Sequence, residues 1–222
     1  MIAPAIASQP TYDPIADFTH IAFLGGPPIA LIASANSDLR SFADFTQAAK
    51  QGTLAGYASS GVGTLGHVLV EQLAKSQGFK LPHVPFNTAA LNDIVAGRVP
   101  VGAFTFGAVL GQLQAGTVRL IAISSEVRHP DYPEVPTFRD LGYDVVATTW
   151  MSLDAPRGLA PEVLAKLNAA TNKILSGQSF QARLKQDGIV PREMSPGELV
   201  EFYEAELKRW VPLARAAVAK AN

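Results

Sequence analysis

The chain contains no cysteine among its 222 residues, so disulfide bonds and cysteine-ligated metal sites are excluded. Its four histidines, His20, His67, His83 and His129, are far apart and show none of the paired spacings of metal-binding motifs. We therefore expect no metal site. The absence of cysteine is compatible with an exported bacterial protein, but it does not identify one.

The chain also lacks an excess of charge of either sign, with 18 Lys and Arg against 19 Asp and Glu and a net charge of -1. This balance gives no indication of nucleic acid or a charged membrane surface as a partner. No apolar stretch reaches the roughly 20 residues that a membrane-spanning helix needs, so no membrane insertion is expected. Residues 1–7 are apolar but have no basic flank, and they do not predict a signal peptide.

What the chain has is enough apolar sequence, 48% of its residues, to build one large domain or two small ones. Its most informative stretch is residues 56–67, which read GYASSGVGTLGH. This pattern predicts the end of a strand, a glycine turn and the start of a helix. The apolar residues after it recur at helical spacing, and Gly78 predicts the helix end.

A turn of this kind favours an anion. Its glycines let the backbone approach a ligand, and the free N–H groups of a helix N-terminus point at it. No Lys or Arg occurs between Lys50 and Lys75, so neutral dipoles would hold the anion, which favours a carboxylate over a multiply charged phosphate. The helix dipole contributes about 0.3 to 1 kcal/mol and a hydrogen bond to a charged group roughly 1.5 to 3 kcal/mol. Several donors must therefore converge, and Ser59, Ser60, Thr64 and the local amides can supply them.

Two competing interpretations use the same turn. Gly61, Gly63 and Gly66 match the G-x-G-x-x-G fingerprint of dinucleotide-binding enzymes, which predicts an α/β enzyme with a nucleotide or phosphate cofactor. That fingerprint requires an acidic residue at the end of the next strand, and the nearest acids, Glu71 and Asp93, do not stand there.

The other interpretation is a serine hydrolase with Ser59 or Ser60 near His67. Residues 57–61 do not meet the G-x-S-x-G pattern of a nucleophile elbow. His67 falls inside the helix itself, where a capping or core-edge role is the commoner one.

The remaining chain predicts alternating elements. Strands are expected at 18–23, 29–33, 54–59, 83–86, 99–104, 118–124 and 144–153, and helices at 42–51, 64–77, 88–96, 107–115, 161–176, 179–187 and from Ser195 onward. The alternation from Leu54 to Ser124 predicts parallel βαβ units, in which ligands bind beyond the carboxyl ends of the strands. Those ends are residues 59–61, 86–88 and 105. Asn87 and Thr88 are also good helix caps, and the two roles are compatible.

The chain is expected to cross between two lobes. Gly25-Gly26-Pro27-Pro28 breaks the path between two strands, and residues 154–158 are the candidate for the return connection. The expected lobes are residues 1–28 with 147–222 and residues 29–146. Ser195-Pro196-Gly197-Glu198 predicts a capping box at the start of the last helix.

An ordered set of motifs runs over almost the whole chain. These are Tyr12-Asp13-Pro14 with Asp17-Phe18-Thr19, then the turn up to His67, His83-Val84-Pro85-Phe86, Val135-Pro136-Thr137 and Ala155-Pro156-x-Gly158. Together they resemble the TctC/Bug family, the periplasmic substrate-binding proteins of tripartite tricarboxylate transporters. The resemblance implies an α/β, two-lobed periplasmic-binding-protein fold of type II-like topology. It also implies a periplasmic location, small di- or tricarboxylate ligands, no cofactor and no catalysis, and delivery of the ligand to a membrane permease.

Position by position, the resemblance implies three groups of ligand contacts. These are Ser59, Ser60, Gly61, Gly63 and Thr64 in the turn, Phe86, Asn87, Thr88 and Ala89 after the next strand, and Thr105. The family usually has Tyr-Lys-Gly where this chain has Phe86-Asn87-Thr88, and often Asp where it has Thr105. These departures bear on which carboxylate is bound.

Family members also carry a βαβαβ segment with two ligand loops that would precede Met1. The first lobe is accordingly expected to be incomplete and to expose apolar helix faces, which favours self-association. The 222-residue polypeptide alone is then expected to bind carboxylates weakly or not at all.

Overall fold

The computed structural model describes residue 7 and residues 9–85, 90–189 and 192–221. The chain divides into two compact units, Met1–Pro27 with Trp150–Ala216 (unit 1) and Pro28–Thr149 with Ala217–Asn222 (unit 2). The first division falls inside the Gly25-Gly26-Pro27-Pro28 sequence. Within the described ranges, no helix is both long enough and apolar enough to cross a membrane.

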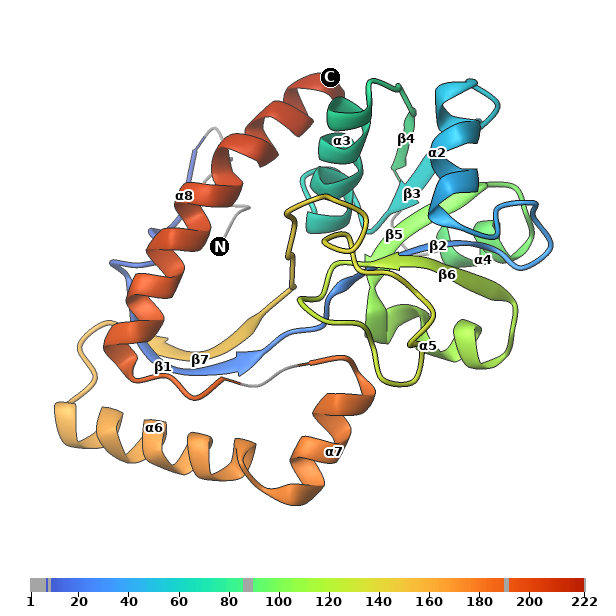
Figure 1. The fold of residues 1–222 in the computed structure, drawn as a ribbon. Coiled ribbons are helices and arrows are strands. Elements are labelled where there is room, and N and C mark those ends of the chain that lie inside the picture. Colours follow the sequence, from blue (N-terminus) through green and yellow to red (C-terminus); the bar gives the residue numbers. More distant parts are fainter. Residues whose placement is uncertain (1–6, 8, 86–89, 190–191, 222) are drawn as a thin grey trace. The chain divides into compact units, whose positions relative to one another are not determined.

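Unit 2 is built on a sheet in the order β4-β3-β5-β2-β6 (Figure 1). Its strands are β2 (Ile29–Ser34), β3 (Tyr57–Ser59), β4 (His83–Pro85), β5 (Val101–Thr105) and β6 (Val118–Ile123). β3 runs parallel to β4 and β5, as the alternation predicts. β2 instead runs antiparallel to both β5 and β6. Every residue of β2 is buried, so its pattern carries no information about its direction.

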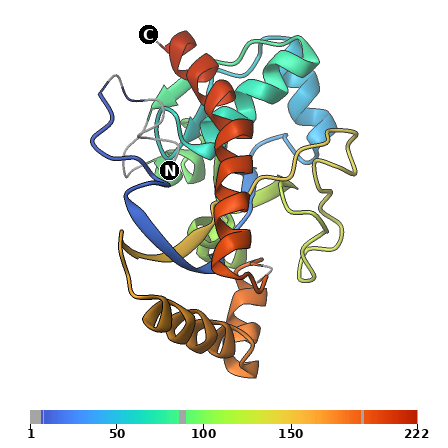
Figure 2. The same ribbon diagram turned by 90° about the vertical axis from the view of Figure 1, so that its left-hand side faces the viewer.

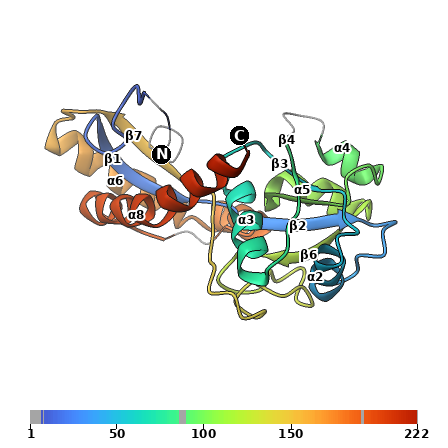
Figure 3. The same ribbon diagram turned by 90° about the horizontal axis from the view of Figure 1, so that it is seen from above.

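Helices cover both faces of this sheet (Figure 3). They are α2 (Phe42–Lys50), α3 (Leu65–Gln77), α4 (Ala90–Val95) and α5 (Phe106–Gln114). Successive side chains of a strand point to opposite faces. Ile29 and Leu31 of β2 accordingly join the cluster with α2 and α3, whereas Ala30 and Ile32 join the cluster with α4 and α5. Strand β2 thus contributes side chains to both apolar cores.

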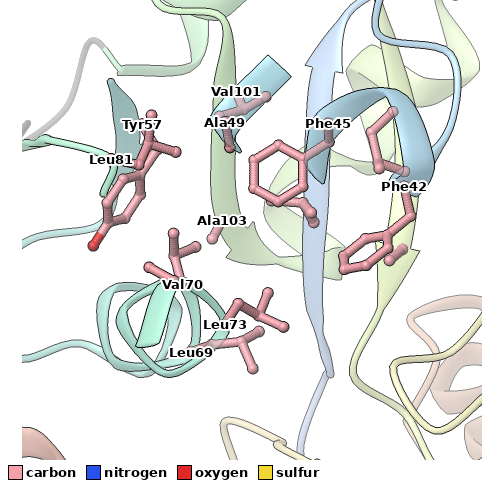
Figure 4. Packing of buried hydrophobic residues seen from close by; sticks show 14 of the residues in the cluster. Phe42, Phe45, Ala49, Tyr57, Leu69, Val70, Leu73, Leu81, Val101 and Ala103 are labelled. Atoms are coloured by element: carbon pink, nitrogen blue, oxygen red, sulfur yellow. The ribbon is translucent and has the colours of Figure 1, made fainter. Parts of the chain in front are cut away.

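The core between α2, α3 and the sheet is aromatic and aliphatic (Figure 4). Phe45 from α2, Leu73 from α3 and Tyr57 from β3 are fully buried there, with Val101 of β5 beside them. Burying a large apolar side chain contributes roughly 1.5 to 3 kcal/mol, so this cluster holds α3 firmly against the sheet. The turn that precedes α3 therefore leads into a helix whose position on the sheet is fixed.

Unit 1 has a two-stranded antiparallel sheet of β1 (Phe18–Gly25) and β7 (Met151–Pro156), which lie side by side in Figure 2. Its helices are α6 (Pro161–Leu175), α7 (Gln178–Gln186) and α8 (Pro196–Ala221), of which α8 belongs to unit 1 only as far as Ala216. A small apolar cluster of Phe23, Met194, Leu199 and Tyr203 joins β1 to the start of α8. His20 is buried beside it, with Nδ1 at 2.6 Å from an Asp154 oxygen.

The predicted capping box at the start of α8 is confirmed. The Glu198 carboxylate accepts the Ser195 N–H at 2.8 Å and the Ser195 hydroxyl at 2.7 Å. The Glu198 N–H donates in return to Ser195 Oγ at 3.3 Å. These bonds satisfy N–H groups that a helix N-terminus otherwise leaves open.

Three predictions about the backbone are wrong. The strand expected at 144–153 is β7, and it begins only at Met151. Val145 packs against the first core, Ala147 is buried, and the Ala147 N–H bonds to Ser124 O at 3.0 Å, so these residues pack on unit 2 without joining β7. The run 154–158, expected as a return connection, lies in β7 and the turn after it. The strand expected from Leu54 is also shorter, starting at Tyr57.

Candidate functional site

The parallel register brings the carboxyl ends of three strands to one edge of the unit 2 sheet. Ser59, the last residue of β3, pairs with Pro85 of β4 and with Ala103 of β5. Thr105 ends β5 two residues further on. The ends that the sequence predicts as ligand loops for β3 and β5 thus lie on neighbouring strands. The expected contacts after β4, Phe86, Asn87, Thr88 and Ala89, lie outside the described residues.

The turn between β3 and α3 is closed by its own hydrogen bonds. Ser59 Oγ accepts the Gly61 N–H at 3.2 Å, and the Thr64 hydroxyl donates to Gly61 O at 2.7 Å. Gly61 has φ 136° and Gly63 has φ 77°, values that L side chains rarely adopt, so the path of the turn requires glycine at both positions. Ser60, just before Gly61, has an exposed side chain.

Two of the helices that leave this edge, α3 and α5, begin without a side-chain cap. Thr64 is the N-cap residue of α3 and Thr105 that of α5, and neither side chain accepts a hydrogen bond from its helix. In α3 the Val68 N–H bonds back to Thr64 O at 3.0 Å. The three N–H groups before it, at residues 65–67, have no partner within the helix. They form a neutral donor set at the positive end of the helix dipole.

Gly66 allows α3 to start close to the sheet. A Cβ atom at Gly66 would lie 2.2 Å from the backbone oxygen of Ala103 in β5. No residue other than glycine fits this approach without moving the helix. The third glycine of the G-x-G-x-x-G pattern is thus explained by packing of a helix on a strand.

Two histidines support the turn from the side of the protein interior. His67 is only 1% exposed, and its Nδ1 accepts the Gly63 N–H at 3.0 Å, which confirms the capping or core-edge role expected for it. His83 was missed by the sequence analysis, although its Nε2 lies 2.8 Å from Ser59 Oγ. The signal that could have identified His83 is the parallel pairing of β3 with β4, which sets His83 directly opposite Tyr57 and so near Ser59.

The two imidazoles lie in contact, with ring centroids 4.3 Å apart. Burial lowers the pKa of His67 below its ordinary value, with the Glu71 carboxylate opposing the shift. Burial, reinforced by the neighbouring His67, lowers the pKa of His83 to about 4. The Tyr57 hydroxyl donates to Glu71 at 3.1 Å, and burial with this carboxylate raises the pKa of Tyr57. Both histidines are therefore neutral at neutral pH.

A cavity of about 600 Å³ adjoins this cluster within unit 2. Among the residues that line it are Val62, His67, Glu71, Lys80, Leu81 and His83. Across the described part of the chain, no group of three or more His, Cys, Asp or Glu side chains is arranged to hold a metal ion.

The contact between Ser59 and His83 brings together the residue types of a hydrolase, but its geometry serves a different purpose. Ser59 is 0% exposed, so its oxygen is shielded from a substrate carbonyl. The same oxygen also accepts the Gly61 N–H, and its hydroxyl lies 3.1 Å from Gly61 O. Ser59 therefore holds the turn between β3 and α3 in shape.

Comparison with known proteins identifies the family. Residues 1–218 match the tripartite tricarboxylate transporter family receptor. A protein of Pseudomonas sp. strain P51, described as a UPF0065 protein in the tcbD-tcbE intergenic region, is 32% identical over 205 residues. That match covers 89% of this chain and 60% of the relative, so the chain spans less than two thirds of the relative's length.

Solved structures agree over nearly the whole chain. A structure described as a periplasmic transporter superposes with a TM-score of 0.85 and 27% identity, covering 100% of this chain and 74% of that one. MatC from Rhodopseudomonas palustris with bound malate gives 0.80 and 27%, covering 96% and 75%. R. palustris Rpa4515 with adipate gives 0.84 and 27%, covering 95% and 72%. These likenesses confirm the predicted α/β periplasmic-binding-protein fold, and the chain belongs to the family of receptors of tripartite tricarboxylate transporters.

Proposed function

We propose that this chain is a periplasmic solute-binding protein that captures a small di- or tricarboxylate without changing it chemically and delivers it to a membrane permease. One ligand carboxylate would meet residues 60–64, which we name the carboxylate loop, and the N-terminus of α3. Thr105 at the start of α5, and Phe86, Asn87, Thr88 and Ala89 after β4, are proposed as further contacts.

The observation that carries the proposal is the pair of helices α3 and α5, which start from neighbouring strands with no side-chain cap. Each helix N-terminus favours an anion by about 0.3 to 1 kcal/mol, and each hydrogen bond to a carboxylate adds roughly 1.5 to 3 kcal/mol. Because the sequence has no Lys or Arg between Lys50 and Lys75, this donor set is neutral and suits a carboxylate. The bound malate and adipate of two similar structures belong to this chemical class.

A thermal-shift screen tests the proposal. Malate, adipate, citrate, aromatic acids and nucleotides are each added at rising concentration, with acetate at matched ionic strength as the reference. A ligand at 100 times its dissociation constant raises the free energy of unfolding by about 2.7 kcal/mol. We expect a saturable rise in melting temperature with one class of di- or tricarboxylate. A rise with nucleotides alone would contradict the proposal.

Two variants test whether the ligand binds at the carboxylate loop. Gly63→Ala places a side chain at φ 77°, a left-handed conformation that costs about 1 to 2 kcal/mol, so the carboxylate loop must change shape and the ligand-induced shift should be lost. Gly111→Ala, on α5 with nothing within 4 Å, should keep the shift. An equal ligand response in both variants would contradict the assignment of the loop.

We also propose that unit 1 self-associates through α6. Val163, Leu167 and Ile174 are 44%, 37% and 61% exposed and recur at helical spacing along this helix. Such an apolar stripe favours a partner surface, here a second copy of the chain. Light scattering should detect a concentration-dependent dimer that Ile174→Glu abolishes and that Lys173→Glu leaves in place. A wild-type chain that stays monomeric at all concentrations would contradict this.

A further inference from the structure

Buried His67 and half-buried His83 of unit 2 each contact one polar group of the turn after β3. His67 Nδ1 accepts the Gly63 N–H at 3.0 Å, and His83 Nε2 lies 2.8 Å from Ser59 Oγ. Gly63 is the residue at φ 77°, and Ser59 holds Gly61. One imidazole thus contacts Gly63 within the carboxylate loop, and the other contacts Ser59, which precedes the loop and accepts the Gly61 N–H.

The bond from Gly63 to His67 requires an uncharged ring. A neutral imidazole has one nitrogen that accepts and one that donates, whereas the charged form has two donors. His67 Nδ1 accepts, so its proton is on Nε2. A proton added to Nδ1 would face the Gly63 N–H, donor against donor, and this bond would be lost.

We propose that His67 is a positioning residue of the carboxylate loop, whose unprotonated Nδ1 keeps Gly63 and the turn around it in the ligand-binding conformation and whose protonation releases them. This inference rests on the proposed function, because it assigns the loop the role of carboxylate binding. It adds a residue that contacts no ligand and a dependence of affinity on pH.

Burial, and not the charged and titratable groups around it, keeps His67 neutral at neutral pH. Glu71 lies on the same helix and favours a charged ring, but the Tyr57 hydroxyl of β3 donates to this carboxylate at 3.1 Å. His83 of β4, in ring contact at 4.3 Å, is itself neutral at neutral pH, and Lys80 lines the same cavity. Burial is the largest effect and lowers the pKa of His67. Release therefore sets in below the ordinary histidine pKa of about 6.5.

The first test needs no ligand. The amide resonance of Gly63 and the ring nitrogens of His67 are followed by ¹⁵N NMR from about pH 7.5 to about pH 5, across the ordinary histidine range. We expect an unprotonated Nδ1 at neutral pH, and a Gly63 amide shift that titrates together with the His67 ring. In His67→Asn, whose side-chain oxygen can accept the same N–H without titrating, the Gly63 shift should stay flat. A wild-type Gly63 shift that does not follow His67 would overturn the proposal.

The second test measures the affinity for malate over the same pH range. Malate itself takes up protons over this range, and this affects both proteins equally, so the wild-type affinity is divided by that of His67→Asn at each pH. We expect this ratio to fall by roughly twofold or more at the acid end of the range. His67→Leu, which fills space without an acceptor, should weaken binding about threefold to tenfold at neutral pH. His129→Asn is the matched control, because His129 is buried in the same unit and its Nδ1 accepts the Asp131 N–H at 3.2 Å, away from the loop.

The outcomes separate this inference from the function on which it rests. Identical pH profiles for wild type and His67→Asn, or full neutral-pH affinity in His67→Leu, would overturn the positioning role while leaving carboxylate binding intact. If no carboxylate binds at any pH, the proposed function fails. The ligand-free Gly63 titration then decides the remaining claim, since a shift that follows His67 supports control of the turn and a flat shift overturns it.

Discussion

Gly66→Ala tests how closely α3 approaches the sheet. The added Cβ would lie 2.2 Å from the Ala103 backbone oxygen and 3.3 Å from the Ala103 Cβ, so α3 must retreat by about 1 Å. Overpacking of this kind costs about 1 to 3 kcal/mol, and the better helix propensity of alanine returns at most about 1 kcal/mol. We expect a net loss of about 2 kcal/mol, which lowers the melting temperature by roughly 4 to 8 °C in a chain of this size.

Gly111→Ala is the matched control for this change. It lies inside α5 with nothing within 4 Å of its Cβ, so only the propensity gain applies and stability should be unchanged or higher by up to about 1 kcal/mol. Calorimetry and urea unfolding of both variants measure the difference. If Gly66→Ala is as stable as Gly111→Ala, the close contact between α3 and β5 is refuted.

Three further predictions concern stability. Ser124→Ala should lower the free energy of unfolding in urea by about 1 to 3 kcal/mol, because Ser124 Oγ accepts the buried Ile29 N–H at 2.7 Å. Its control is Ser176→Ala at an exposed position, which should change this free energy by less than about 0.5 kcal/mol. Equal effects of the two substitutions would contradict the prediction. Ser195→Ala should cost about 1 kcal/mol by removing the cap of α8, whereas Ser179→Ala on exposed α7 should not. The unfolded chain protonates His83 near pH 6.5 and the folded chain only near about 4, so stability should fall as pH drops through this window. The shift allows at most about 3 kcal/mol, which solvent screening of the partly exposed ring reduces to roughly 1 to 2 kcal/mol. His83→Gln should flatten this slope, and an unchanged slope would contradict the assignment.

Local chemistry made much of the fold predictable. The helix expected at 161–176 is α6 (Pro161–Leu175), because proline favours the first helical position. The helix expected at 64–77 is α3, which ends at Gly78 with φ 70°, as the glycine signal predicted. Capping and turn signals act over four to six residues, so a single sequence displays them fully.

Features that depend on distant segments were not predictable in the same way. The antiparallel course of β2 depends on pairing with β5 and β6, and a strand buried along its whole length carries no directional pattern. Val145, Val146 and Ala147 have the composition of a strand. Val145 instead packs on a core and Ala147 is buried, and the ladder starts only at Met151.

The candidate site likewise has one part that local sequence predicts and another part that depends on distant segments. The turn, its glycines and its open helix N-terminus follow from residues 56–67 alone. The support by His83 comes from a different strand, 24 positions after Ser59, and requires the register of β3 with β4. The predicted ligand contacts themselves remain a prediction.

A titration of malate into ¹⁵N-labelled protein, followed residue by residue, tests the central claim most directly, and it detects weak as well as tight binding. We predict saturable shifts of the amides of residues 60–67 and of the first turn of α5, with little change along α6 and α7. The absence of saturable shifts, or shifts confined to residues away from the carboxyl ends of β3 and β5, would contradict carboxylate binding at this loop.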